Sequence, residues 1–213
     1  MSLPLPCLML VSDLALCGGP SGLVAAVEAA VAGGVDAVQL REKDLPPDEL
    51  LSLGRRLREV TSGRALLLVN GPLDVALACG ADGIHLPEAA PPVERPRPDF
   101  LVGRSVHSTD AALRAEADGS DYLVAGPVYE TRSHPGAAPA GTGLIAQIAG
   151  AVRLPVLAIG GLNAERMDEV VRAGAAGIAV ISAVLAAASP AAAARDLRRA
   201  LDAAWVRAHA VRL

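Results

Sequence analysis

Short apolar runs alternate with longer amphipathic stretches along the whole chain. Runs that are apolar throughout are typical of strands buried on both faces, as in parallel sheets. The predicted strands are Cys7–Val11, Ala37–Leu40, Ala65–Val69, Gly83–Leu86, Leu101–Ser105, Tyr122–Ala125, Val156–Ile159 and Gly177–Ile181. The stretches with helical spacing are Ser21–Ala32, Pro47–Val60, Pro72–Ala78, Thr109–Asp118, Gly143–Ala151, Ala164–Ala173 and Pro190–Ala208. The proline-rich segment Glu88–Pro98 is predicted to be a loop or a very short helix.

A recurring phrase joins predicted helices to the strands that follow them. It reads "VAGGVDAVQL", "ALACGADGIHL", "AEADGSDYLVAG" and "VRAGAAGIAVI". A glycine can close a helix in the left-handed conformation, and a short loop then leads into the strand. This recurring unit and the count of eight predicted strands predict an α/β fold, a single (β/α)8 TIM barrel whose one domain spans residues 1–213. The competing Rossmann-like sheet is disfavoured because no G-x-G-x-x-G follows the first strand.

Composition excludes several classes of function. Aromatic residues make up 2% of the 213 residues and the net charge is −4, so we expect no nucleic-acid binding. Three cysteines without a C-x-x-C argue against disulfides and zinc. The N-terminus lacks a basic signal-peptide region and no run reaches about 18 apolar residues, so we expect a cytoplasmic protein without a membrane segment.

In a TIM barrel the active site lies where the strands end, and two late strand ends predict a phosphate site. "LAIGGLNAERM" places Gly160 and Gly161 before Asn163, which can cap a helix, and "AVISAVL" places Ile181 and Ser182 at the last strand end. Glycines allow close approach to a ligand, and helix N-termini attract anions. The alternative is an ordinary glycine turn with a capping serine.

The phrase "VQLREKD" predicts a cationic part of the site. Alternation places Gln39, Arg41 and Lys43, the chain's only lysine, on one face of a strand end. An arginine and a lysine directed into a barrel mouth suit a phosphate or carboxylate. The alternative is a solvated cluster in which Glu42 and Asp44 neutralise the cations.

The long segment "GPVYETRSHPGAAPAGTG" predicts a lid over the site. Thr131 and Ser133 can bind phosphate oxygens, and His134 can carry a proton near neutral pH. The alternative is a mobile exposed loop. His85 and His107 also end strands, where a structural role is open to both.

Together the phrases "VQLREK", "LLVN…LDVALACGADGIHL", "GRSVHS", "DYLVAGPVYET" and "LPVLAIGGLNAERMDEVVRAGAAGIAVISAV" resemble the thiamine phosphate synthase/TenI superfamily. The resemblance implies a (β/α)8 barrel of thiamine biosynthesis. The synthase joins a pyrimidine methyl diphosphate to a thiazole phosphate, with Mg²⁺ and basic residues stabilising the departing pyrophosphate. It implies pyrimidine and pyrophosphate contacts for Gln39, Arg41, Lys43 and Asn70, and places Ser105 beside the reacting pyrimidine. The implied cradle of the thiazole phosphate is Thr131, Ser133, Gly161, Ile181 and Ser182.

Three positions depart from the synthase pattern. Gly71 replaces an aspartate that binds Mg²⁺, and the phrase that carries a second metal aspartate ends here in Ala90. His134 replaces a lysine beside the pyrophosphate. Magnesium requires oxygen ligands, usually carboxylates, so these changes predict loss of the metal site. Glu88 or Asp74 could substitute, but Asp74 is predicted to begin a helix and point away.

These departures favour a TenI-like enzyme that binds a thiazole phosphate and catalyses metal-independent proton transfer, as a thiazole tautomerase does. The TenI histidine falls at Pro127, so His134 is the predicted acid/base, with Ser105 and Lys43 as further catalytic residues. No metal ligand and no cofactor are expected. One alternative is a thiamine phosphate synthase with a rearranged Mg²⁺ site, and another is a non-catalytic binder of thiazole or thiamine phosphate. A homodimer is expected by analogy alone.

Overall fold

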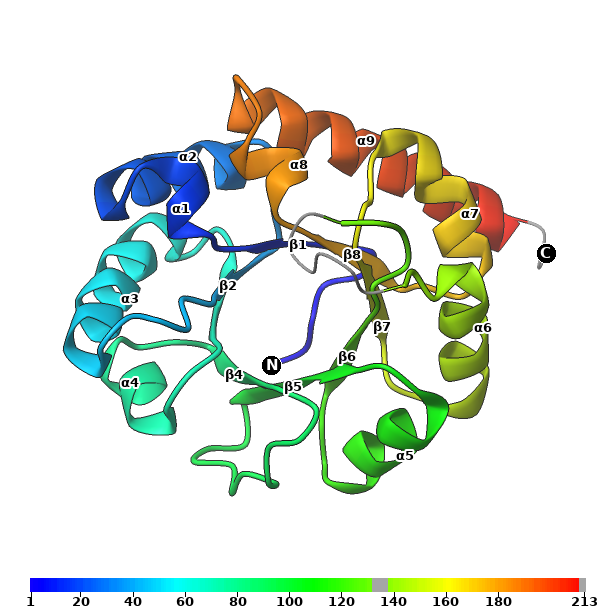
Figure 1. Cartoon of the computed structure of the whole chain (residues 1–213), viewed down its shortest axis with the longest axis horizontal. Coiled ribbons are helices and arrows are strands. Elements are labelled where there is room, and N and C mark those ends of the chain that lie inside the picture. The colour runs from blue at the N-terminus through cyan, green and yellow to red at the C-terminus, as the bar shows by residue number, and fades with distance from the viewer. Residues whose placement is uncertain (132–137, 211–213) are drawn as a thin grey trace.

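A closed barrel of parallel strands forms the centre of the molecule (Figure 1). The computed structural model describes residues 1–131 and 138–210. Within these ranges eight strands pair in chain order, and β8 returns to pair with β1. The strands are β1 (Cys7–Val11), β2 (Ala37–Leu40), β3 (Leu66–Val69), β4 (Gly83–Leu86), β5 (Leu101–Val106), β6 (Tyr122–Ala125), β7 (Val156–Ile159) and β8 (Gly177–Val180). The predicted (β/α)8 barrel is therefore confirmed.

Helices surround the barrel and follow most of the strands (Figure 1). They are α1 (Leu14–Cys17), α2 (Pro20–Ala32), α3 (Pro47–Thr61), α4 (Leu73–Ala78), α5 (Thr109–Ala117), α6 (Gly141–Ala151), the 3₁₀ helix η1 (Ala164–Arg166), α7 (Met167–Arg172), α8 (Ser182–Leu185) and α9 (Pro190–His209). Asn163 caps η1 as predicted, since its side chain accepts from the amide of Arg166. The sequence did not predict the two short helices α1 and α8. Among the described helices, none is long and apolar enough to cross a membrane.

Alternate residues of each strand face either the barrel interior or the surrounding helices. The outer residues form a large apolar cluster with the helices, which includes Val38, Ile84 and Leu123. The inner residues form a smaller cluster, which includes Met9 and Tyr122. The N-terminal segment lies across the middle of the barrel in the view of Figure 1, and its Leu3 packs in the inner cluster. The barrel is thus filled at one end, which leaves the other end for a site.

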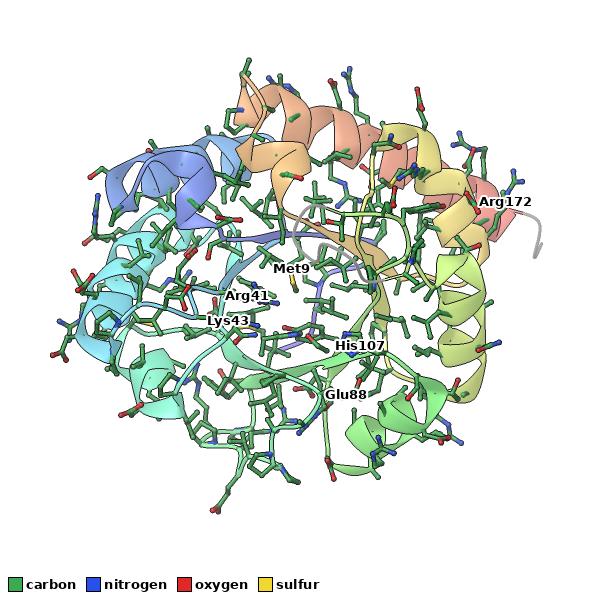
Figure 2. The ribbon with its side chains drawn as sticks, in the orientation of Figure 1. Met9, Arg41, Lys43, Glu88, His107 and Arg172 are labelled. Atoms are coloured by element: carbon green, nitrogen blue, oxygen red, sulfur yellow. The ribbon has the colours of Figure 1, made fainter. Side chains whose placement is uncertain are left out.

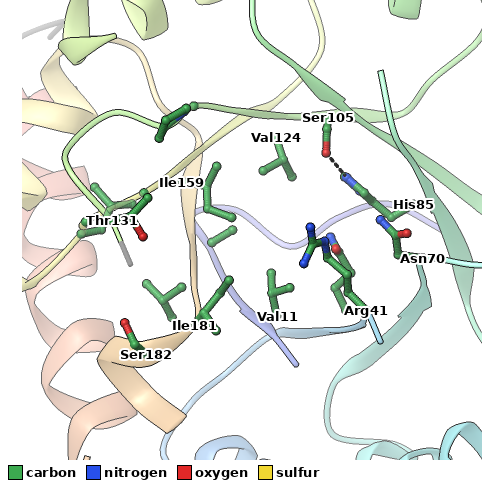
Figure 3. A pocket seen from close by; sticks show the side chains of 18 of the residues that line it. Val11, Arg41, Asn70, His85, Ser105, Val124, Thr131, Ile159, Ile181 and Ser182 are labelled. Carbon is green, nitrogen blue, oxygen red and sulfur yellow. Dashed lines mark hydrogen bonds between the residues drawn. The ribbon is translucent and has the colours of Figure 1, made fainter. Parts of the chain in front are cut away.

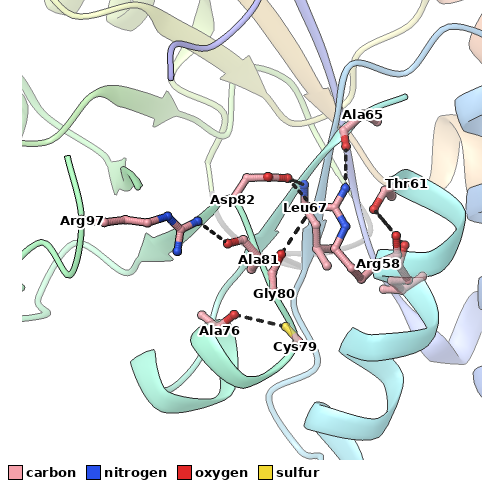
Figure 4. Close-up of polar contacts among 11 residues, drawn as sticks. Arg58, Thr61, Ala65, Leu67, Ala76, Cys79, Gly80, Ala81, Asp82 and Arg97 are labelled. Atoms are coloured by element: carbon pink, nitrogen blue, oxygen red, sulfur yellow. Dashed lines mark hydrogen bonds and ion pairs between the residues drawn. The ribbon is translucent and has the colours of Figure 1, made fainter. Parts of the chain in front are cut away.

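An aspartate placed directly before β4 joins that strand to its neighbour (Figure 4). Asp82 Oδ2 accepts a 2.7 Å hydrogen bond from the amide of Leu67, in β3. The same oxygen forms a 2.7 Å ion pair with Arg58 of α3, and both side chains are largely buried. The carboxylate therefore satisfies a backbone amide near the start of a strand and also anchors a helix to the barrel.

The same arrangement occurs before β2 and before β6. Asp36 and Asp121 each accept a 2.7 Å hydrogen bond from an amide of the preceding strand and pair with an arginine. The partners are Leu8 and Arg198 for Asp36, and Val102 and Arg95 for Asp121. These three aspartates, which we call the strand-start aspartates, belong to the repeated phrases of the sequence. In the fourth phrase Ala176 occupies the equivalent position before β8.

The connection between β4 and β5 is a loop without a helix, the first of the two predicted forms. Arg104 of β5 is 3% exposed and lies beneath this loop. Its guanidinium donates to the carbonyl oxygens of Glu88 at 3.3 Å, Ala90 at 2.5 Å and Pro91 at 3.5 Å. The arginine therefore satisfies loop carbonyls that a helix would otherwise have paired.

We predict that Asp82→Ala lowers the free energy of unfolding by about 2–4 kcal/mol, because it leaves the Leu67 amide and the buried Arg58 unpaired. Asp196→Ala is the matched control, since Asp196 pairs with Arg199 on the exposed face of α9. It should cost less than about 0.5 kcal/mol. Urea denaturation measures both values, and equal losses would contradict a special role for the strand-start aspartate.

Candidate active site

A cavity of about 460 Å³ lies at the C-terminal ends of the strands. It brings together every described residue that the sequence predicted to bind substrate or to take part in catalysis: Gln39, Arg41, Lys43, Asn70, Ser105, Thr131, Gly160, Gly161, Ile181 and Ser182. Ser133 and His134 lie outside the described residues, so their predicted roles stay predictions. The cavity is where TIM barrels place their active sites.

Arg41 and Lys43 supply positive charge to one part of this cavity (Figure 2). The carboxylate of Glu42, the acid between them in the sequence, accepts from the Ser12 hydroxyl at 2.5 Å and from the Leu14 amide at 3.2 Å. Within the described part of the chain, neither Arg41 nor Lys43 forms an ion pair. Both cations are therefore available to an anionic ligand.

A second polar region lies across the cavity from Arg41 (Figure 3). Thr131 and Ser182 place hydroxyl groups there, on the opposite side from Arg41 and Asn70. Apolar side chains line the space between the two regions, namely Val11, Val124, Ile159 and Ile181. A ligand with an apolar middle and an anionic group at each end would match this distribution of charge and hydroxyl groups.

Gly160 and Gly161 shape the wall beside the hydroxyl groups. Their φ angles are +104° and +63°, which L side chains rarely adopt. A Cβ on Gly161 would lie 2.5 Å from the carbonyl oxygen of Glu130, and a Cβ on Gly160 would lie 2.8 Å from Pro127 Cα. The two glycines are therefore needed for the loop after β6 to pack against the loop after β7. This packing role is additional to the prediction that they let a ligand approach the backbone closely.

His85 forms a buried hydrogen-bonded network that the sequence did not predict. Its Nε2 lies 2.9 Å from Ser105 Oγ, and its Nδ1 lies 3.1 Å from the Tyr122 hydroxyl (Figure 3 shows the first contact). Burial, followed by the positive charges of Arg41 and Arg104, lowers the pKa of His85 to about 3. His85 is thus a neutral imidazole at physiological pH. Its inward position on β4 was the available sequence signal.

Glu88 and His107 form a second pair, at the rim of the cavity (Figure 2). Glu88 Oε2 accepts from the His107 amide at 2.7 Å and lies 2.8 Å from His107 Nδ1. Because the carboxylate can only accept, Nδ1 carries the hydrogen and donates it to Glu88, which leaves Nε2 as the ring atom that can act on a ligand. This pair was also missed, since it depends on how the β4–β5 loop folds.

The described side chains do not form a site for the Mg²⁺ that the synthase resemblance implies. Among the described cavity residues Glu88 is the one carboxylate, and its Oε2 already accepts from the His107 amide and lies 2.8 Å from His107 Nδ1. A Cβ on Gly71 would start 2.9 Å from Leu50 Cδ2, and Gly71 does not line the cavity. Asp74 lies in α4, outside the cavity, as predicted. Residues 132–137 contain no acid, and the described chain has no cluster of three metal-binding side chains. The donor set therefore does not fit a protein-built magnesium site.

Comparison with known proteins gives consistent results. The thiamine monophosphate synthase family (TMP-TENI) matches residues 8–184. A thiamine-phosphate synthase of Methanoculleus marisnigri is 48% identical, over 82% of this chain and 86% of the relative. The thiamine-phosphate synthase of Moorella thermoacetica is 44% identical, over 85% and 89%. The solved structure of a thiamine phosphate pyrophosphorylase from Pyrococcus furiosus has a TM-score of 0.80 and 36% identity, covering 93% of this chain and 96% of that one.

These similarities confirm the superfamily that the sequence resembled. They favour the synthase alternative over the TenI-like hypothesis, which was the one preferred from the sequence.

We predict that the neutral state of His85 makes the stability of the chain depend on pH. In the unfolded chain the pKa of His85 is near 6.5, whereas in the folded chain it is about 3. The unfolded state therefore holds more protons between these values, and the free energy of unfolding should rise with pH there. The contribution is on the order of 1 kcal/mol per pH unit.

Urea unfolding of the wild type and His85→Gln, from pH 4 to pH 8, measures this slope. Below about pH 6.5 the free energy of unfolding of the variant should rise less steeply with pH than that of the wild type, whatever the absolute stability of the variant. In NMR spectra the His85 ring signals should stay constant from pH 5 to pH 8. A titration midpoint near neutrality would contradict the prediction.

Proposed function

Because this chain belongs to the thiamine monophosphate synthase (TMP-TENI) family and is an enzyme of thiamine biosynthesis, we propose that it joins a pyrimidine methyl diphosphate to a thiazole phosphate. The observation that carries the proposal is the cavity with two polar regions across an apolar middle. Two anionic substrates that meet at their rings need such an arrangement. The names of relatives that match more than four fifths of the chain support the same reaction.

In this reaction the bond between the pyrimidine methylene and the diphosphate oxygen breaks, and the electron pair leaves with pyrophosphate. The lone pair of the thiazole nitrogen then forms the new bond to the methylene carbon. Charge develops on the departing oxygen, so cations placed beside it lower the barrier. Arg41 and Lys43 are suited to this role because neither is engaged in an ion pair within the described residues.

The remaining cavity residues are suited to holding the two rings in position. Asn70 presents an amide on the same side as Arg41, where the resemblance implies the pyrimidine. Gln39 of β2, two residues before Arg41, also lines the cavity. Thr131 and Ser182 present hydroxyls on the other side, where it implies the thiazole phosphate. Holding the reacting nitrogen and carbon in contact can supply a large part of the rate enhancement.

We predict that Arg41→Gln lowers kcat/KM for thiamine phosphate formation by about 10²-fold or more, because it removes a charge aimed at the leaving group. Arg172→Gln is the matched control, since Arg172 lies on the outer side of the molecule (Figure 2) and should leave the rate unchanged. The assay is run with Mg²⁺ and with EDTA. Absence of thiamine phosphate under both conditions, from folded wild-type protein, would overturn the synthase proposal.

One observation favours a second candidate, a TenI-like thiazole tautomerase. Among its described residues the cavity lacks the paired carboxylates of a metal site, yet it holds the imidazole of His107 fixed by Glu88. Tautomerisation of a thiazole carboxylate phosphate removes a carbon-bound proton and adds one elsewhere in the same molecule, so it needs a proton carrier and no metal. His107 Nε2 is available for that role. His134 remains the sequence-based candidate.

We predict for this second candidate that His107→Gln lowers tautomerisation by about 10²-fold or more, and that Glu88→Gln has a smaller effect. His209→Gln, at the exposed end of α9, is the matched control. Tautomerisation that persists both in EDTA and in His107→Gln would assign the proton transfer to His134, and His134→Gln tests that assignment. Tight binding of thiazole phosphate without turnover in either assay would instead support a non-catalytic binder.

A further inference from the structure

Three polar side chains from successive strands connect the barrel core to the cavity. Tyr122 of β6 is fully buried in the inner apolar cluster, and its ring covers Gly103 so closely that a Cβ there would lie 2.0 Å from Tyr122 Cζ. His85 of β4 lies between Tyr122 and Ser105, which faces the cavity. The ring of Tyr122 cannot be reached by a ligand, so any role in the reaction must pass through His85.

We propose that Tyr122 is a positioning residue: its hydroxyl donates to His85 Nδ1, which fixes His85 as the Nε2–H tautomer and leaves the Ser105 hydroxyl hydrogen free for the ligand.

The direction of the hydrogen bonds follows from counting donors and acceptors. Among the described residues, His85 Nδ1 is the one hydrogen-bond partner of the Tyr122 hydroxyl. If Nδ1 carried the proton, the phenolic hydrogen would have no acceptor in an apolar cluster, which is unfavourable. A neutral imidazole carries one ring proton, so that proton lies on Nε2 and is donated to Ser105 Oγ.

If His85 were doubly protonated, both ring nitrogens would donate, and the hydrogen bond between Nδ1 and the Tyr122 hydroxyl would change direction. Burial and the nearby positive charges of Arg41 and Arg104 oppose that state and lower the pKa of His85 to about 3. The tautomer is therefore set by Tyr122 alone over the working range of pH.

The consequence concerns what Ser105 can recognise. A Ser105 oxygen that accepts from His85 has no base to take its own proton, so it is a hydrogen-bond donor and not a nucleophile. It would select an acceptor atom on the ligand, such as an unprotonated ring nitrogen or an oxyanion. This changes the role predicted for Ser105 from catalysis to positioning. The inference rests on the proposed function only for the identity of that ligand.

The first test needs no ligand. ¹⁵N-histidine NMR of the free protein reports the tautomer of each of the four histidines, and His85→Gln identifies the His85 signals. The wild type should show a proton on Nε2 and an unprotonated Nδ1, and Tyr122→Phe should shift His85 toward a mixture of tautomers. Tyr129→Phe, the change at the chain's other tyrosine, should leave the His85 signals unchanged. A proton on Nδ1 in the wild type would overturn the proposal, even if Tyr122→Phe fails to fold.

The second test is a double-mutant cycle with thiamine phosphate as the probe, measured by calorimetry. Tyr122→Phe and Ser105→Ala should each weaken binding about fivefold, as expected for one hydrogen bond. In the Ser105→Ala background, Tyr122→Phe should weaken binding by less than about a further twofold, because Tyr122 acts through the Ser105 hydroxyl, which that background lacks. Independent, additive losses would show that Tyr122 acts only through packing and would overturn the proposal. Failure of the wild type to bind this probe would count against the proposed function, while the NMR result would still decide the tautomer.

Discussion

The hydrogen bond from a strand-start aspartate to the neighbouring strand is the constraint from which the site follows. Asp36, Asp82 and Asp121 each fix where an even-numbered strand begins relative to the strand before it. A slip of one residue would turn every side chain to the other face of the barrel. The third residue after each aspartate faces inward and lines the cavity: Gln39, His85 and Val124. Ala179 holds the same position after Ala176, so alternate strands supply one layer of the cavity floor.

The use of charge differs between the two ends of the barrel. At the strand starts, carboxylates and arginines neutralise each other in largely buried pairs such as Asp82 with Arg58. At the strand ends, Glu42 is engaged by Ser12 and Leu14, and Glu88 is engaged by His107. Arg41 and Lys43 thus face the cavity without acidic partners among the described residues. The same distribution that attracts an anion leaves few oxygen ligands for a divalent cation.

Much of this organisation could be predicted from the sequence, because strand and helix periods are local signals. The predicted strand Ala37–Leu40 matches β2, and Leu101–Ser105 falls one residue short of β5. Gln39, Arg41 and Lys43 were placed together from alternation alone. The helices α1 and α8 were missed because four residues are too few to show a period. The hydrogen bond between Tyr122 and His85 was missed because it joins side chains of β4 and β6, two strands separated by β5, whose inward-facing side chains meet only inside the curved barrel. The sequence likewise could not show that a side chain at position 71 would meet Leu50 of α3.

The two candidate reactions place different demands on this one cavity. Both substrates carry anionic groups that could bind at the cationic and hydroxyl-lined regions, so binding alone does not distinguish them. Loss of pyrophosphate concentrates new negative charge on the departing oxygen, and compensation by Arg41 and Lys43 then decides the rate. Tautomerisation creates no leaving group, and its rate depends on a proton carrier such as His107. A Ser105 hydroxyl held as a donor by His85 would serve either reaction, since each requires a ring held in one orientation. The chemistry of this chain is therefore set by the rim of the cavity, where Lys43, Glu88 and His107 lie, while the floor below it is common to both reactions.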